Sequence, residues 1–177
     1  DLAGGTLDIW PLYLFHNGAQ TLNAGITLRA ECTLSNSTDG AWHLLSEDTG
    51  ETLRLEALTE TVSHEKHRLV LRLLQFFRPK PVRILTRSGS PIGAGLGGSS
   101  ALNIALCAAL ARYTDTAYTS ESLMDLALNL ETQVIGVPTG AQDYRPAMYG
   151  GVSAIEMGPA GVTHTALPID TNELGER

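Results

Sequence analysis

The first third of the chain alternates between apolar and polar positions with the two-residue period of β-strands. The longest alternation covers residues 20–35, which are rich in Thr, Leu and Ile and follow an Asn-Gly turn signal. Two shorter segments of strand character, 41–46 and 51–57, are separated by the turn residues Asp-Thr-Gly. This part of the chain therefore predicts three strands, the first of them long.

Helical spacing follows. Leu69, Leu73 and Phe76 recur at three- and four-residue intervals and predict a helix over residues 64–78. Pro79 would end this helix, because proline lacks the N–H group that the next turn needs.

The rest of the chain mixes both patterns. Residues 82–86 predict a strand that leads into a glycine-rich segment, and helices are predicted over 99–112 and 120–135. Residues 151–157 and 161–169 read as a hairpin with Gly-Pro-Ala-Gly at its turn. Strands and helices do not alternate as regular βαβ units, so the predicted fold class is α+β, in one domain over residues 1–177.

Composition narrows the function classes. The chain has 177 residues, 43% hydrophobic and 18% charged, with a formal net charge of −7. These values indicate a globular protein, and the negative charge argues against nucleic acid as a partner. The longest apolar helical run, near residues 101–111, is too short to cross a bilayer, and no signal peptide is visible. We therefore expect a cytoplasmic protein without a membrane partner.

The cysteines, histidines and basic residues do not indicate a catalytic or metal site. Cys32 and Cys107 lie far apart without metal-ligand spacing, and Cys107 reads as a small core residue, so a reducing compartment is expected. The five histidines are interpreted as solvated surface positions. A basic stretch is interpreted as a solvated helix face that runs into a strand, rather than as an anion site. Its members are Lys66, Arg68, Arg72, Arg78, Lys80, Arg83 and Arg87.

The most informative segment, residues 88–101, is glycine-rich and lies between a predicted strand and a predicted helix. Its four glycines allow positive φ angles and close approach of the backbone to a ligand. They are Gly93, Gly95, Gly97 and Gly98. A helix starting near Ser99 would present free N–H groups and a positive dipole end, which suits phosphate. Ser99 and Ser100 could cap this helix or reach a phosphate or its metal ion.

Three alternatives bear on this segment. The glycines formally match the dinucleotide pattern G-x-G-x-x-G, but residues 113–119 offer no buried second strand. The P-loop pattern requires a lysine after the last glycine, and none is present. A flexible loop before a capped helix, without a ligand, is the third alternative.

Three carboxylates stand out. Glu131 has Ala127, Leu128, Val134 and Ile135 as its helical neighbours, so it lies on an apolar face and needs a metal ion or a basic partner. A buried salt bridge to an arginine is the competing interpretation.

Asp143 and Asp8 occupy turn-rich segments. Asp143 follows the second long helix in a loop that could position a catalytic group, or it could simply cap a short helix. Asp8 follows a Gly-Gly turn between apolar residues and could accept hydrogen bonds from sugar hydroxyls, or it could be an exposed turn residue.

Three motifs carry a family resemblance. Residues 91–101, Pro-Ile-Gly-Ala-Gly-Leu-Gly-Gly-Ser-Ser-Ala, resemble the phosphate loop of the galactokinase, homoserine kinase, mevalonate kinase and phosphomevalonate kinase superfamily. The passage from Glu131 to Asp143, with Gly-Val and Gly140 between them, looks like the galactokinase pattern. Leu-Ala-Gly-Gly before Asp8 is similar to the sugar-kinase branches of fucokinase and heptose-phosphate kinase.

The resemblance implies a fold and a set of roles. The fold would be the N-terminal, ribosomal-protein-S5-domain-2-like kinase domain, a mixed sheet packed against helices. Ser100 and Glu131 would hold Mg²⁺, and Asp143 would act catalytically on the accepting hydroxyl. Asp8, Thr139, Gly140 and Asp143 would contact the substrate. The residues that would hold the ATP phosphates are Pro91, Gly93, Ala94, Gly95, Leu96, Gly97, Gly98, Ser99 and Ser100.

The expected function is transfer of the γ-phosphate of ATP to a hydroxyl of a sugar or sugar phosphate. A kinase of mevalonate or another non-sugar alcohol, and a non-catalytic sugar- or nucleotide-binding module, are the alternatives. Family members also have a basic residue upstream of the first motif and a second domain with another glycine motif, and neither lies within this sequence. We therefore expect the 177 residues alone to be inactive and to self-associate through an uncovered apolar face.

Overall fold

The computed structural model describes residues 2–59, 65–91 and 93–169. The chain divides into two compact units. The continuous unit runs from Leu28 to Val137, and the split unit combines the residues up to Thr27 with those from Pro138 onward.

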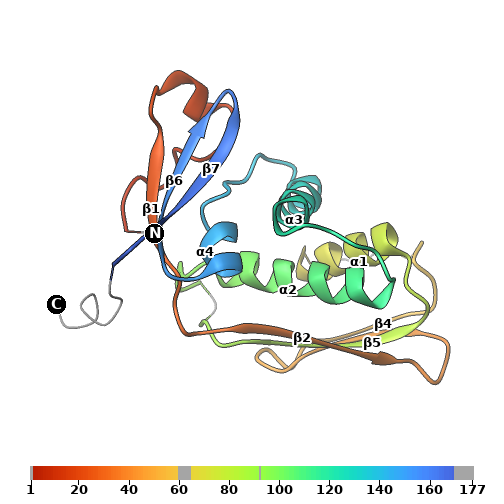
Figure 1. Cartoon of the computed structure of the whole chain (residues 1–177). Helices are drawn as coiled ribbons and strands as arrows, with labels where there is room; N and C mark the ends of the chain where they lie inside the picture. Colours follow the sequence, from red (N-terminus) through yellow and green to blue (C-terminus); the bar gives the residue numbers. More distant parts are fainter. Residues whose placement is uncertain (1, 60–64, 92, 170–177) are drawn as a thin grey trace. The chain divides into compact units, whose positions relative to one another are not determined.

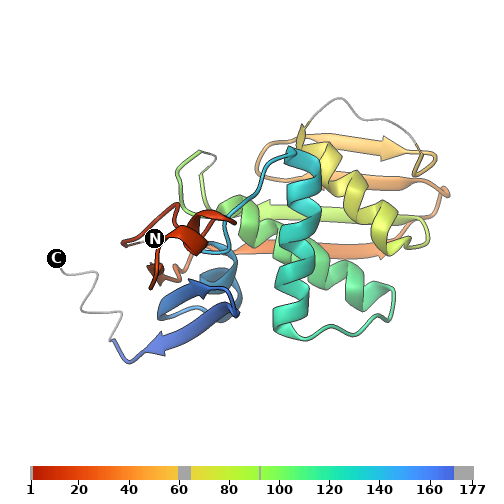
Figure 2. The same ribbon diagram turned by 90° about the horizontal axis from the view of Figure 1, so that it is seen from above.

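The continuous unit is a four-stranded mixed sheet with three helices on one of its faces (Figures 1 and 2). The strand order is β2-β5-β3-β4, in which β3 and β5 run parallel and the other pairs antiparallel. Helix α3 packs on α1 and α2, and α2 packs on β2 and β5. The elements are β2 (Ala30–Asn36), β3 (Trp42–Ser46), β4 (Thr52–Leu55), α1 (Glu65–Phe77), β5 (Val82–Ser88), α2 (Gly98–Tyr113) and α3 (Ser120–Ile135).

Alternation along β5 explains which face of the sheet is covered. Val82, Ile84 and Thr86 are buried, whereas Arg83 and Arg87, at alternate positions of the strand, are exposed. Because successive side chains of a strand point to opposite faces, one face of the sheet packs against the helices and the other is polar. Leucines from all three helices complete this core, and those with at most 2% exposure are Leu73, Leu74, Leu106, Leu110 and Leu130.

The split unit is built on an antiparallel sheet in the order β1-β6-β7. Its small core consists of Ala19, Ile155 and Met157, with Leu7 and Tyr13 among the residues packed against them. The elements are η1 (Leu12–Phe15), β1 (Gln20–Ala24), α4 (Tyr144–Tyr149), β6 (Val152–Gly158) and β7 (Gly161–Leu167).

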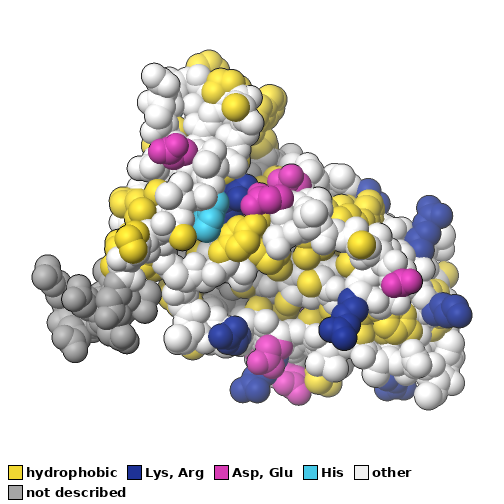
Figure 3. Space-filling view, viewed as in Figure 1, with side chains coloured by type: hydrophobic (Ala, Val, Ile, Leu, Met, Phe, Trp, Pro, Cys, Tyr) yellow, Lys and Arg dark blue, Asp and Glu magenta, His cyan; other side chains and the backbone are white. Residues whose placement is uncertain are grey.

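The segment around η1 exposes large apolar side chains. Trp10 is 60% exposed and Phe15 is 76% exposed. Figure 3 shows hydrophobic side chains at the top of the view, where η1 lies in Figure 1. Such a group of side chains is unusual for a surface that faces only water.

The α+β class and most predicted elements are confirmed. Helix α3 covers residues 120–135 as predicted, and the hairpin is formed by β6 and β7. The structure describes α1 from Glu65; the first position predicted for this helix, residue 64, lies outside the described residues. Helix η1 was not predicted, and α4 was considered only as the short helix that Asp143 could cap. In the described part of the chain, no helix is both long enough and apolar enough to cross a bilayer.

The prediction of one long strand over 20–35 is wrong. Residues 20–24 and 30–36 form separate strands in different sheets. The break falls at Gly25, whose N–H donates to the carbonyl of Gly151 at 2.7 Å. A Cβ on Gly25 would lie 2.7 Å from the Cα of Gly150, so this close approach of two backbones requires glycine.

The prediction that all histidines are solvated is wrong for three of them. His43 Nε2 lies 2.8 Å from Oδ1 of Asp39, and hydrogen bonds from His43 and Ser37 hold the pKa of Asp39 well below its ordinary value. His164 is half-buried, with its ring 4.7 Å from that of Tyr149. His67 Nε2 lies 3.9 Å from a carboxylate oxygen of Glu51. His16 is exposed as predicted.

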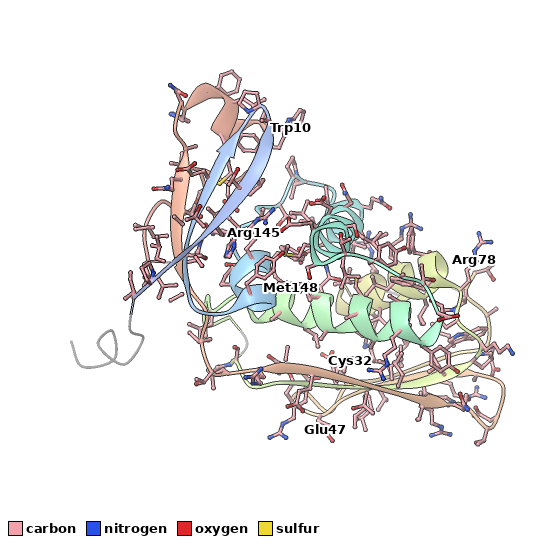
Figure 4. The ribbon with its side chains drawn as sticks, in the orientation of Figure 1. Trp10, Cys32, Glu47, Arg78, Arg145 and Met148 are labelled. Atoms are coloured by element: carbon pink, nitrogen blue, oxygen red, sulfur yellow. The ribbon has the colours of Figure 1, made fainter. Side chains whose placement is uncertain are left out.

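Both cysteines are free thiols. Cys107 is fully buried as predicted, and Cys32, labelled in Figure 4, lies on β2. Burial raises the pKa of each thiol to about 12. Since the thiolate is the reactive form, both cysteines are structural.

Candidate active site

The glycine-rich segment forms an open loop between β5 and α2. Gly93, Gly95 and Gly97 have φ angles of 75°, 68° and 68°, in the left-handed region that side chains disfavour. No described atom lies within 4 Å of the Cβ position of Gly93 or Gly95, so conformation rather than crowding selects glycine there. Gly98 does not share this conformation, contrary to the prediction, because it is the first residue of α2.

Helix α2 begins without a side-chain cap. Its N-cap residue is Gly97, and among the described residues no side chain makes a capping hydrogen bond there. Ser99 and Ser100 lie inside the first turn, so the prediction that they cap the helix is wrong. The first N–H groups of a 16-residue helix therefore face the glycine loop without side-chain acceptors. This arrangement fits an anionic group such as phosphate.

Ser100 and Glu131 lie on neighbouring helices. Ser100 is 6% exposed in the first turn of α2, and Glu131 is partly buried near the end of α3. The buried face of α3 includes Ala127 and Leu130 and not Ile135, which is 40% exposed, against the prediction. Glu131 thus borders the core, as its pattern indicated.

Ser100 and Glu131 are better suited to Mg²⁺, which keeps waters and phosphate oxygens as ligands, than to a metal ion bound by protein ligands alone. The described residues contain no group of three or more His, Cys, Asp or Glu that could hold a metal ion. Mg²⁺ is commonly bound by one or two protein ligands, phosphate oxygens and several waters. A hydroxyl and a carboxylate at Ser100 and Glu131 are suitable ligands for such an ion.

Asp8 is 4% exposed, so the interpretation as an exposed turn residue is wrong. Its Oδ2 accepts a hydrogen bond of 2.7 Å from the backbone N–H of Gln142. A Cβ on Gly140 would lie 2.0 Å from the same oxygen, and Ile9 forms a β-bridge with Gly140. Within the described part of the chain, Oδ1 of Asp8 has no hydrogen-bond partner. One oxygen is therefore fixed by the backbone and the other is left for a donor.

Asp143 stands at the N-cap position of α4, but its carboxylate does not cap that helix within the described residues. Burial raises the pKa of Asp143, and the negative charge of Asp8 raises it further. Because the N–H that donates to Asp8 belongs to Gln142, the residue before Asp143, the two carboxylates are close to each other in the split unit. The structure thus brings together Asp8, Gly140 and Asp143, and Thr139 is half-buried beside Gly140.

Several buried polar side chains escaped the sequence analysis. Asn23 and Ser153 face each other across β1 and β6, and the Nδ2 of Asn23 donates to the hydroxyl of Thr21 at 2.9 Å. Arg145, labelled in Figure 4, is 5% exposed on α4. Asn103 is fully buried in α2. An asparagine at an inward position of an apolar pattern was the available signal for Asn23 and Asn103.

The fold and the loop define an α+β domain with a helix end that fits a phosphate group, and comparison with known proteins shows what the chain is similar to. Residues 65–151 match the GHMP kinases N terminal domain. The D-glycero-alpha-D-manno-heptose 7-phosphate kinase of Campylobacter jejuni is 32% identical over 161 residues, which cover 88% of this chain and 47% of that protein. Over residues 65–151 the chain is thus similar to GHMP kinases, as the resemblance implied, and it spans about half the length of this relative.

Solved structures agree. A D-glycero-D-manno-heptose 1-phosphate kinase from Bacteroides thetaiotaomicron superposes with a TM-score of 0.84 at 25% identity, covering 99% of this chain and 59% of that one. The galactokinase of Lactococcus lactis, solved with galactose, has a TM-score of 0.76 at 20% identity, covering 96% and 45% of the two chains. The second likeness supports the fold alone.

The raised pKa of Asp143 predicts a stability effect with a definite sign. When the pKa of a carboxyl group is higher in the folded than in the unfolded state, ionisation of that group destabilises the fold. The full cost is present at pH values above the folded-state pKa. The cost disappears below the ordinary aspartate pKa of about 3.9, where both states are protonated. Asp143→Asn should therefore raise the melting temperature near neutral pH, and the gain should vanish on acidification.

Melting temperatures of the wild type and Asp143→Asn, measured from neutral pH to below the ordinary aspartate pKa, check this prediction. Asp125→Asn, at an exposed position of α3, is the matched control and should show no such gain. A melting temperature that falls at neutral pH, or a gain that persists in acid, would contradict the assigned burial cost.

Proposed function

We propose that this chain provides the nucleotide-binding and acceptor-binding residues of an ATP-dependent kinase that phosphorylates a hydroxyl of a sugar phosphate, of the heptose type. The observation that carries the proposal is the loop of left-handed glycines before the uncapped end of α2. The sugar-phosphate acceptor is inferred from the heptose-phosphate kinase that is 32% identical over most of this chain.

The continuous unit supplies the groups for the nucleotide. The N–H groups of the loop and of the first turn of α2 would donate hydrogen bonds to the β- and γ-phosphates, and the helix dipole would add positive potential. The Ser100 hydroxyl and the Glu131 carboxylate would hold Mg²⁺. When bound, Mg²⁺ would neutralise charge on the phosphate oxygens during transfer.

The split unit supplies the groups for the acceptor. Asp143 would accept the proton of the attacking hydroxyl while the hydroxyl oxygen bonds to the γ-phosphorus and ADP departs. The raised pKa of Asp143 makes it a stronger base than an ordinary aspartate. The unpaired Oδ1 of Asp8 would accept a hydrogen bond from a second hydroxyl and orient the ring.

The alternatives have weaker support. The mevalonate kinases among the structural neighbours are 15% to 16% identical and share only the fold. Partial burial of the Asp143 carboxylate, which does not cap α4, raises the free energy of its ionised form. A binding module without catalytic activity would have no need for such a costly carboxylate.

We also propose a cytoplasmic location, in keeping with two free cysteines and a need for ATP. Self-association through the exposed apolar side chains around η1 remains a proposal of the same kind, and sizing of the protein in solution would check it.

The proposed activity is tested with the full-length protein, ATP and a panel of free and phosphorylated sugars, together with mevalonate, by following ADP release. We expect release to depend on a heptose phosphate. Asp143→Asn should lower the turnover number by about 10²–10⁴ with little change in ATP affinity, because it removes the base and not a phosphate contact. ADP release that responds only to mevalonate, or full turnover by Asp143→Asn, would reject the proposal.

Gly140→Ala should weaken acceptor binding. The new Cβ would displace the Asp8 carboxylate from the N–H of Gln142, and loss of such a charged hydrogen bond is worth about 1.5–3 kcal/mol. We expect the KM for the acceptor to rise by roughly tenfold or more, with the KM for ATP unchanged. Gly158→Ala is the matched control, because no described atom lies within 4 Å of its Cβ position. Equal kinetics in both variants would exclude this role for Asp8.

Gly97→Val should abolish nucleotide binding in a folded protein. The φ of 68° at Gly97 is costly for a β-branched residue, and the loop must leave this conformation to relieve the strain. Calorimetric titration with a non-hydrolysable ATP analogue measures the effect. Wild-type affinity in this variant would show that the loop does not hold the phosphates.

A further inference from the structure

One buried polar residue of the continuous unit lies on the helix of one proposed metal ligand and is hydrogen-bonded to the helix of the other. Asn103 is 0% exposed, and its Nδ2 donates a 2.9 Å hydrogen bond to the backbone carbonyl of Ala127 on α3. On the other side of the amide, the thiol of Cys107 donates to Oδ1 at 3.6 Å. Both ends of the side chain are therefore fixed. Burying a side-chain amide in an apolar core costs free energy unless such partners are present. We therefore asked what the Asn103 side chain does at this position of α2.

The positions joined by this hydrogen bond are informative. Asn103 is three residues after Ser100, one helical turn along the same side of α2. Ala127 is four residues before Glu131, so the carbonyl that accepts from Asn103 also accepts from the N–H of Glu131 within the helix. The bond thus ties the turn next to Ser100 to the turn that holds Glu131.

The packing of the two helices supports the same tie. Ala127 is fully buried, and a methyl side chain allows the helix backbones to approach closely enough for an asparagine to span them. Apolar contacts such as those of Ala127 are non-directional. A hydrogen bond favours a defined length and angle, so it restricts the sliding of one helix along the other.

We propose that Asn103 is a positioning residue that sets the separation of the Ser100 hydroxyl and the Glu131 carboxylate, and through it the affinity for the metal–nucleotide complex. The inference rests on the proposed function. Mg²⁺ requires ligands at 2.0–2.1 Å in nearly octahedral geometry, so a shift of α3 along α2 by a fraction of a turn would cost a ligand. Asn103 does not itself touch metal or substrate.

The test uses Asn103→Leu in the full-length protein. Leucine has a similar volume and no donor, so the core stays filled. Binding of ADP without metal, and of Mn²⁺ to the ADP complex, is measured by calorimetry and by the electron paramagnetic resonance of Mn²⁺. We expect ADP affinity without metal to stay within about twofold and Mn²⁺ affinity to fall by about tenfold, the usual range for groups that orient metal ligands.

Two further variants separate positioning from stability. Leu110→Ala, fully buried elsewhere in α2, should lower the melting temperature and leave Mn²⁺ affinity unchanged. In a Glu131→Gln background, Asn103→Leu should have no further effect on Mn²⁺ affinity, because it acts through Glu131. If Asn103→Leu does not fold, Asn103→Ser makes the same test, since its hydroxyl is too short to keep the contact with Ala127.

The outcomes distinguish failure of the positioning role of Asn103 from failure of the proposed metal site. Wild-type Mn²⁺ affinity in Asn103→Leu, equal losses of ADP and Mn²⁺ affinity, or additive effects with Glu131→Gln would overturn the role of Asn103 and leave the kinase proposal intact. If added Mn²⁺ does not change the ADP affinity of the wild type, and Glu131→Gln does not change it either, the metal site itself is overturned and the positioning role with it.

Discussion

The backbone N–H groups that open α2 are the constraint on which the continuous unit depends. A helix leaves its first N–H groups without intrahelical partners, and most helices satisfy one of them with a side-chain cap. Here the N-cap is Gly97, and no described side chain takes that place. Gly93, Gly95 and Gly97 before the helix have left-handed backbone conformations and no side chains of their own. Helix α2 thereby forgoes the stability of a side-chain cap, which leaves its first N–H groups open to the anion proposed above.

The missing cap of α2 has consequences for the core of the continuous unit. Since α2 loses a stabilising cap, its stability comes from burial, and its inner residues Leu106, Cys107 and Leu110 are at most 2% exposed. The same burial leaves few positions for polar groups. Asn103 occupies one of them, and its amide donates a hydrogen bond to α3, so the helix of the proposed anion site and the helix with Glu131 share a directional contact. The core and the proposed metal site are therefore parts of one packing arrangement.

Local periodicity predicted most of the fold, whereas contacts between distant residues did not follow from it. The bounds of α3 follow from its apolar stripe, its Thr119 cap and its terminal Gly136. The break between β1 and β2 depends on Gly25 meeting Gly150, which no local pattern reveals. For the candidate site, the left-handed glycines before a helix could be predicted because they lie close together in the sequence. The burial of Asp8 was not, since it depends on Gly140 and the N–H of Gln142 far along the chain.

The split unit shows the same exchange of stability for chemistry. Asp8 and Asp143 are neighbours of like charge, and burial together with Asp8 raises the pKa of Asp143. A capping bond to α4 would have favoured ionised Asp143 and lowered its pKa, but the carboxylate does not make one to the described residues. Asp8 is instead held by one backbone N–H and keeps one oxygen unpaired. Asp8 is thus anchored and Asp143 has a raised pKa, and the proposed roles of orienting a substrate and accepting its proton rest on this difference.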